Sequence, residues 1–131
     1  MFKYRKLKYY KYKTTEVYSV DTPIKPNDYI KNSNYVKLNP RGRLVISKGY
    51  AWDGASGPAI DTDTIMRASL IHDALYQLIR SGDLDKKYRH AVDELLRDIC
   101  LEDGMHVFRA TYVFWAVRLF GGFAIEKDSG E

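Results

Sequence analysis

The first half of the chain consists of short runs of β-favouring residues separated by turn signals. Tyrosine, valine and threonine dominate residues 3–20, and a second extended stretch covers residues 29–38. The Asn-Pro-Arg-Gly sequence at residues 39–42 predicts a turn, and the apolar run at residues 44–46 is typical of a buried strand. We therefore expect a small antiparallel sheet within residues 1–50.

The period of the apolar residues becomes helical after a loop. Residues 51–64 contain glycines, a proline and the N-capping sequence Asp-Thr-Asp-Thr, which favour a loop that leads into a helix. The following residues recur at helical spacing: Ile65, Ala68, Ile71, Leu75 and Ile79. Ser81, Gly82 and Asp83 predict the end of this first helix.

Two further helices are expected in the second half. Apolar spacing predicts one from about Asp85 to Leu101 and another from about His106 to Phe120. Gly121 and Gly122 predict the end of the third helix, and we expect the polar end of the tail to fray. The predicted fold class is α+β, with a small N-terminal antiparallel sheet followed by three helices.

The bulk composition is that of one folded domain. The 131 residues are 45% hydrophobic and 29% charged, which excludes a disordered composition. We expect residues 1–131 to form a single domain, divided into a mainly β part (1–50), a loop (51–64), a helical part (65–122) and a tail (123–131).

Cysteine use and hydropathy favour a cytoplasmic protein. Cys100 is the single cysteine, so no intramolecular disulfide forms and a reducing compartment fits. No apolar run follows the basic N-terminus, and no stretch approaches the length of a membrane span. We therefore expect no signal peptide and no transmembrane segment, so that any membrane contact is peripheral.

The net charge of +4 is concentrated near the N-terminus, in a segment that we call the basic strip. Its cations are Lys3, Arg5, Lys6, Lys8, Lys11 and Lys13, and they alternate with Tyr4, Tyr9, Tyr10 and Tyr12. Such a strip suits an anionic surface, either nucleic acid or lipid. We favour the structural alternative, in which lysines protect an edge strand from aggregation and the tyrosines pack.

The strongest candidate site lies on the first two helices. Their connection is short, which predicts an antiparallel helix pair. His72 and Asp93 would then lie at similar heights on facing sides, with Tyr76 one turn beyond His72. A carboxylate fixes the tautomer of a histidine and makes it a better base, which suits His72 to remove a proton from water.

A second part of the candidate site would bind a metal ion. Asp73 points about 100° away from His72 around the helix, toward the side where a loop carries Asp53. Two carboxylates with loop carbonyls suit a hard divalent cation such as calcium, which would polarise a carbonyl or phosphoryl oxygen. Another arrangement left open is a zinc site, for which the ligands would be His72, Asp73, His90 and Asp93.

Each of these residues also has a structural interpretation. A histidine beside an apolar helix face is commonly a satisfied structural residue, and Asp73 alone suits a solvated helix position. Asp93 has Arg89 and Arg97 one turn away on its own helix as alternative partners. Asp53 suits a turn with the glycine that follows it. A buried polar network that fixes the helix pair uses the same residue types as an active site.

Several motifs resemble those of a known family. They are GYAWDGASGP at residues 49–58, ASLIHDALY at 68–76, AVD at 91–93, and Tyr112 with WAVRLFG at 115–121. In this order they resemble a small phage and prophage family known as domain of unknown function 1353. The resemblance covers roughly residues 40–122. It implies a phage or prophage origin and the host cytoplasm, with association with the virion as a further option, but it implies no reaction.

A more local resemblance concerns the secreted phospholipases A2. In that family one helix carries histidine and aspartate followed by a tyrosine, and a second helix supplies an aspartate to the histidine. By position, the resemblance makes His72 the base, Asp93 its orienting partner and Tyr76 a supporting hydrogen bonder. It also makes Asp73 and Asp53 calcium ligands. The disulfides of that family are absent, and its glycine-rich calcium loop is reduced to residues 53–58.

These observations lead to two functional hypotheses. The first is a metal-assisted hydrolase, similar to phospholipase A2 in its His72 and Asp93 pair, which acts on a lipid or other ester. The alternative is a non-enzymatic phage accessory or structural protein that binds a host or virion partner through its basic, tyrosine-rich sheet.

Overall fold

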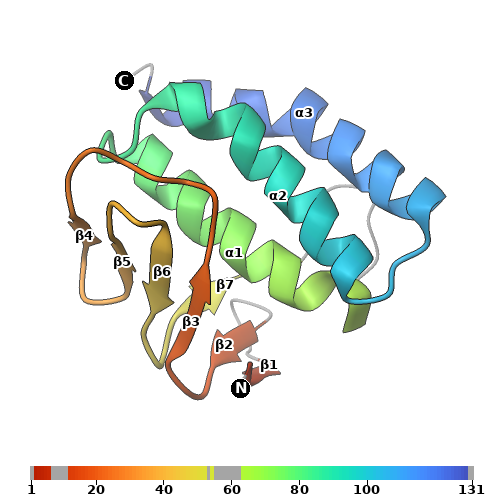
Figure 1. Ribbon diagram of the computed structural model, residues 1–131, viewed down its shortest axis with the longest axis horizontal. Helices are drawn as coiled ribbons and strands as arrows, with labels where there is room; N and C mark the ends of the chain where they lie inside the picture. The colour runs from red at the N-terminus through yellow and green to blue at the C-terminus, as the bar shows by residue number, and fades with distance from the viewer. Residues whose placement is uncertain (1, 7–11, 53, 55–62, 130–131) are drawn as a thin grey trace. The chain divides into compact units, whose positions relative to one another are not determined.

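The computed structural model describes residues 2–6, 12–52, 54 and 63–129 (Figure 1). The chain divides into two compact units, residues 1–54 and residues 55–131. We call them the β unit and the helical unit, and each is described by itself.

The described residues of the β unit form seven short strands in two antiparallel sheets. The strands are β1 (Tyr4–Lys6), β2 (Tyr12–Thr14), β3 (Tyr18–Asp21), β4 (Ile30–Asn32), β5 (Val36–Leu38), β6 (Arg43–Ile46) and β7 (Ala51–Trp52). One sheet has the order β1-β2-β7 and the other has the order β3-β6-β5-β4. The predicted antiparallel pairing is present, but in two sheets, because β7 lies in the predicted loop and pairs with β2 and not with the neighbouring β6.

Alternation of side chains gives each sheet one apolar face. Val36 and Leu38 on β5 and Leu44 and Ile46 on β6 have no exposed surface, whereas Lys37 between the first pair is half-buried. The turn before β6 requires Gly42, whose φ is +88°. A Cβ atom there would lie 2.0 Å from the carbonyl oxygen of Thr22, so the turn excludes any other residue.

Apart from Lys3, which precedes β1, the described part of the basic strip lies on β1 and β2, and β1 is an edge strand. Tyr4 and Tyr12 pack against each other and against Trp52 of β7, with ring centroids 5.4–5.7 Å apart. Tyr4 on the edge strand β1 and Tyr12 on the middle strand β2 therefore pack as the structural interpretation of the strip predicts. Lys8, Tyr9, Tyr10 and Lys11 lie outside the described residues.

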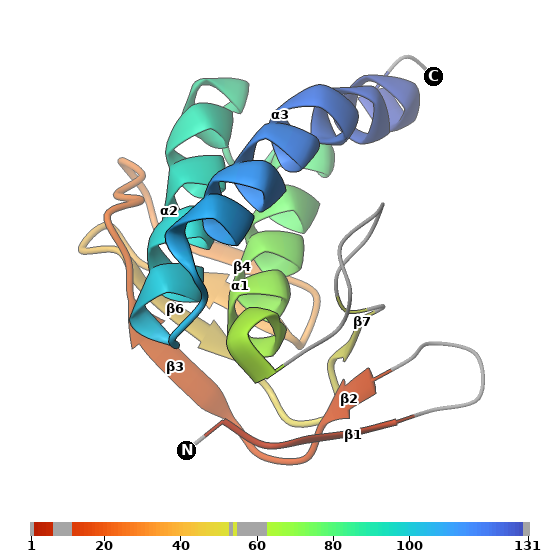
Figure 2. The same cartoon turned by 90° about the vertical axis from the view of Figure 1, so that its right-hand side faces the viewer.

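In the helical unit, residues 63–129 form three long helices and one short 3₁₀ turn. They are α1 (Asp63–Arg80), η1 (Lys86–Tyr88), α2 (Arg89–Glu102) and α3 (Val107–Ser129). Both views show α1 and α2 side by side, with α3 packed along them (Figures 1 and 2). The buried residues of α1 include Ile71, Leu75 and Ile79, which the helical spacing indicated.

The α+β fold class is confirmed, but two helix boundaries differ from the prediction. The chain from residue 86 first forms the 3₁₀ turn η1, so α2 begins later than expected. The predicted end of the third helix at Gly121 and Gly122 is wrong, because α3 continues to Ser129. The predicted tail is therefore mostly helical. At Gly121 tertiary packing overrides the low helix propensity of glycine.

Candidate functional site

Asp93 is the centre of the candidate site. It lies on α2, and none of its surface is exposed. Its Oδ1 atom lies 2.7 Å from Nε2 of His72 and accepts a hydrogen bond of 2.5 Å from the hydroxyl of Tyr76. Both partners come from α1 and are one turn apart, with ring centroids 4.0 Å from each other. The predicted pairing of His72 with Asp93 across the helix pair is therefore present.

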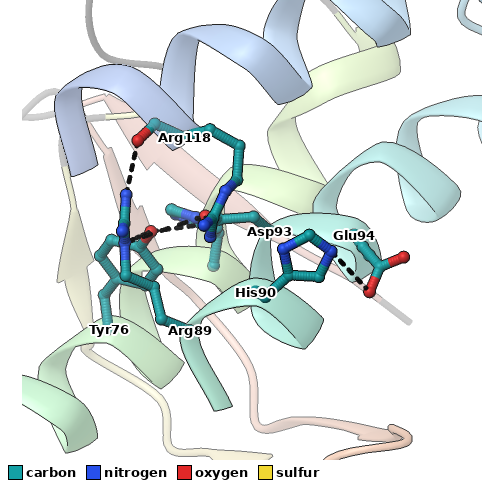
Figure 3. A network of polar contacts seen from close by, with 7 residues as sticks. Tyr76, Arg89, His90, Asp93, Glu94 and Arg118 are labelled. Carbon is teal, nitrogen blue, oxygen red and sulfur yellow. Dashed lines mark hydrogen bonds and ion pairs between the residues drawn. The ribbon is translucent and has the colours of Figure 1, made fainter. Parts of the chain in front are cut away.

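The second carboxylate oxygen of Asp93 faces two arginines. Arg118 of α3 donates a 2.9 Å hydrogen bond from Nη1 to Oδ2, and Nε of Arg89 lies 4.0 Å from the same oxygen. Arg89 also donates to the Tyr76 hydroxyl at 3.3 Å and to the main-chain carbonyl of Arg118 at 2.6 Å. Figure 3 shows these side chains converging from three helices. We call His72, Tyr76, Arg89, Asp93 and Arg118 the Asp93 network.

The network keeps Asp93 ionised despite its burial. Burial alone would raise the pKa of the Asp93 carboxyl. Hydrogen bonds from His72, Tyr76 and Arg118 outweigh that effect and lower the pKa below its ordinary value. The pKa of Tyr76 is raised, first by burial and then by its hydrogen bond to Asp93. Tyr76 therefore remains a hydrogen-bond donor to a carboxylate that only accepts.

This arrangement determines the roles of the two nitrogens in the His72 ring. An ionised carboxylate only accepts hydrogen bonds, so Nε2 must carry the proton that it shares with Asp93. In the neutral imidazole the lone pair is then on Nδ1, which makes no hydrogen bond to any described residue. Every described side-chain nitrogen or oxygen that is sealed from solvent has a hydrogen-bond partner. Nδ1 therefore has access to solvent, although His72 exposes only 8% of its surface.

Gly121 allows α3 to approach Tyr76 closely. A Cβ atom at this position would lie 2.6 Å from the Tyr76 hydroxyl oxygen and 2.9 Å from its ring. No larger residue fits without moving the tyrosine away from Asp93. The same close contact explains why a glycine stands at this position inside the helix.

Sequence reasoning missed Arg118 and Gly121 as parts of the site. Arg118 and Gly121 belong to the motif at residues 115–121, but no spacing rule relates this motif to Asp93. Arg89 was considered as a partner of Asp93 one turn away, and it does lie near Oδ2. Arg97, the other such candidate, lies near Glu94 and Asp98 instead.

The comparisons with known proteins identify the family but not an activity. The family model described as "Protein of unknown function (DUF1353)" matches residues 30–117. The chain belongs to this family. The match includes His72, Tyr76 and Asp93 and ends one residue before Arg118. Neither a curated protein nor a solved structure matches the chain. The resemblance to phospholipases A2 thus rests on the motif alone.

Of the two proposed calcium ligands, the structure describes only one. Asp73 lies half-buried on α1 beside His72, whereas Asp53 lies outside the described residues. Within the described ranges, no group of three or more histidine, cysteine, aspartate or glutamate residues could bind a metal ion. Calcium binding by Asp53 and Asp73 therefore stays a prediction.

The zinc alternative, by contrast, is wrong. Its four ligands, His72, Asp73, His90 and Asp93, are all described, and they do not form a metal-binding group. His90 is instead largely exposed and lies 3.4 Å from Glu94 on its own helix (Figure 3).

Proposed function

We propose that this protein is a metal-assisted hydrolase in which His72 acts as the general base and Asp93 orients it. The observation that carries the proposal is that the two ring nitrogens of His72 have different surroundings. Nε2 is engaged by a buried carboxylate, while Nδ1 makes no hydrogen bond within the described part of the chain. This is the pattern expected of a base that accepts a proton from water.

The chemistry follows from this pair. Nδ1 of His72 takes a proton from a water molecule as the water oxygen attacks an ester carbonyl. The imidazolium that forms is stabilised by Asp93 through Nε2, and Tyr76 fixes the carboxylate from the same side. The imidazolium then returns the proton to the departing alkoxide, so the base is regenerated. The phospholipase A2 resemblance points to lipid esters as the substrate class.

Asp53 and Asp73 remain the proposed ligands of a divalent cation, and calcium is the preferred ion because it takes carboxylate oxygens as ligands in flexible geometry. Such a cation would polarise the ester carbonyl. A phage or prophage origin is likewise part of the proposal, with action in the host cytoplasm or in the virion. Among the described residues, no helix is long and apolar enough to cross a membrane.

The test compares two histidine variants on α1 and α2. His72→Asn removes the base, whereas His90→Asn changes a largely exposed histidine that interacts with Glu94 and not with Asp93. Fatty-acid release from phosphatidylglycerol vesicles is measured with calcium or with a chelator. We expect hydrolysis by the wild type and by His90→Asn, and a loss of about 10²–10⁴-fold in His72→Asn. Equal rates in the two variants would exclude His72 as the base.

One observation favours a second candidate function. Arg118 of α3 donates a hydrogen bond to the Asp93 carboxylate, and Arg89 lies close to the same oxygen, so the Asp93 network connects α1, α2 and α3. A buried network of this kind can fix a fold without catalysing a reaction. The protein would then be a phage accessory protein that binds a host or virion partner. In that case His72→Asn lowers the melting temperature, and no vesicle composition yields hydrolysis in the wild type.

A further inference from the structure

A hollow in the β unit is lined by three cations. It encloses about 340 Å³, and its lining residues are Arg5, Lys13, Thr14, Thr15 and Lys48. All five belong to the β unit. Arg5 and Lys48 are exposed, and Lys13 and Thr15 are half-buried, so a ligand can reach the hollow from solvent. We call this feature the basic hollow.

Strand register places two of these cations against each other. β1 pairs with β2 so that Arg5 is directly opposite Lys13. Directly opposed residues in an antiparallel pair point to the same face, with Cβ atoms about 4.5–5.5 Å apart. Like charges at such positions destabilise the sheet. The register therefore concentrates positive charge at a place where that charge does not stabilise the sheet.

Thr14 brings the third cation to the same place. Its hydroxyl donates to the carbonyl of Ser47 and accepts from the amide of Tyr50, each at 2.9 Å. Its main-chain carbonyl accepts from Gly49, and its amide donates to Tyr50, again at 2.9 Å. Thr14 is buried, and these four bonds fix the segment before β7 against β2. Lys48 lies within that segment, so the same four bonds hold its backbone beside β2.

The three cations have no acidic partner in the described part of the chain. The side chains of Arg5, Lys13 and Lys48 make no ion pair or hydrogen bond to a described residue, and neither does the Thr15 hydroxyl. Nearby Lys3 differs, because it forms a 2.8 Å ion pair with Glu16. Among the described residues, one lysine of this region therefore has a carboxylate partner, whereas the three cations around the hollow have none.

We propose that the basic hollow binds a phosphate group. A guanidinium offers a planar pair of donors, two ammonium groups add charge, and the Thr15 hydroxyl adds a neutral donor. A phosphate monoester carries a charge of about −2 near neutral pH, which offsets most of the charge of the three cations. The phosphate can belong to a free phosphorylated compound or to a lipid headgroup. This proposal is independent of the hydrolase proposal, because it uses only residues of the β unit.

The test measures phosphate binding by the full-length protein and by matched variants. Inorganic phosphate and glycerol phosphate are titrated at constant ionic strength, and the backbone amide signals of Thr14, Thr15, Lys48 and Gly49 are followed by NMR. We expect saturable shifts at these amides. Lys48→Gln and Arg5→Gln should each weaken binding about tenfold, because each removes charge-assisted hydrogen bonds.

Lys31→Gln is the control. Lys31 faces Lys37 across β4 and β5, so it is another lysine in a like-charged cross-strand pair, but it does not line the hollow. Its removal should leave phosphate binding unchanged. Equal weakening by Lys31→Gln and Lys48→Gln, or no saturable shift with either phosphate compound, would overturn the proposal.

Vesicles distinguish the two sources of phosphate. Binding to phosphatidylglycerol vesicles that Lys48→Gln weakens and Lys31→Gln does not would support a lipid headgroup. Saturable binding of glycerol phosphate without vesicle binding would support a free phosphorylated compound. Binding to a single-stranded oligonucleotide that depends equally on Lys31 and Lys48 would indicate a diffuse charged surface, and would contradict a defined hollow.

Discussion

The two units of this protein differ in whether their clustered charges are paired. In the helical unit, Asp93 is fully buried and receives hydrogen bonds from His72, Tyr76 and Arg118, with Arg89 close by. In the β unit, three cations surround a solvent-accessible hollow without an acidic partner in the described part of the chain. Burial requires a charge to be paired, whereas exposure permits charges to remain unpaired.

This difference separates charges that build the fold from charges that serve a ligand. Removing one member of a buried charged network leaves its partners unsatisfied, so stability should depend strongly on Asp93. Removing a cation from the basic hollow relieves repulsion and should cost little stability. The hydrolase proposal gives the helical unit a reactive group as well, because the hydrogen bond to Asp93 uses Nε2 of His72 and leaves Nδ1 of the same ring outside the network.

The largest expected effect is that of Asp93→Ala. It leaves His72, Tyr76 and Arg118 without their acceptor, and we expect a loss of about 3–5 kcal/mol in the free energy of unfolding. Urea denaturation measures this loss. Asp98→Ala is the control, because Asp98 is on the same helix but largely exposed beside Arg97. We expect a change within about 0.5 kcal/mol for this control. Similar losses in both variants would show that the network is not a stabilising unit.

Gly121→Ala should have the next largest effect. The added methyl group would lie 2.6 Å from the Tyr76 hydroxyl, so Tyr76 must move away from Asp93. Overpacking of this kind costs about 1–3 kcal/mol. In a Tyr76→Phe background the nearest clashing atom is absent, and the same substitution should cost less. A cost that is identical in both backgrounds would mean that Gly121 does not act through Tyr76.

The pH dependence of stability should reflect the lowered pKa of Asp93. The unfolded chain binds a proton at the ordinary pKa of 3.8, whereas the folded protein binds it only at lower pH. The stabilisation is therefore fully present above pH 3.8 and is lost as pH falls through the folded pKa. Chemical denaturation between pH 6 and about pH 2 should show this loss. Asp93→Asn should flatten that part of the curve, and an unchanged slope would contradict the assignment.

The rate of thiol labelling at Cys100 should show a smaller effect that distinguishes the two units. Burial raises the pKa of the Cys100 thiol on α2 to about 11, and the negative charge of Asp103 adds to this shift. The thiolate is the reactive form, so labelling by a thiol reagent requires the helical unit to open. Labelling should accelerate in Asp93→Ala and stay at the wild-type rate in Lys48→Gln. Acceleration in Lys48→Gln would show that the basic hollow also stabilises the helical unit.

Much of the fold could be predicted because local patterns specify it. Apolar residues at helical spacing identified α1 and α2, and the Asn-Pro-Arg-Gly turn identified the start of β6. The pairing of β7 with β2 could not be predicted, since strand partners are chosen by tertiary packing and not by sequence neighbours. The end of α3 was mispredicted for the same reason, because the contact between Gly121 and Tyr76 is non-local.

The candidate site was predictable to the extent that it depends on one helix pair. A short connection fixes the relative heights of His72 and Asp93, and Tyr76 follows from the helical repeat. Arg118 was not predictable as a partner of Asp93, because its position depends on how α3 packs on the pair. The basic strip indicated affinity for anions, but only the register of β1 and β2 and the contacts of Thr14 define the basic hollow.

The most direct test of the central claim is the tautomer of His72. Long-range ¹H–¹⁵N NMR spectra show which ring nitrogen carries the proton in the neutral imidazole, and Asp93→Asn identifies the partner of that proton. We expect the proton on Nε2, with a signal displaced by its hydrogen bond to Asp93 and lost from that position in Asp93→Asn. A proton on Nδ1 in the wild type would leave no lone pair facing solvent, and would contradict the role of His72 as the base.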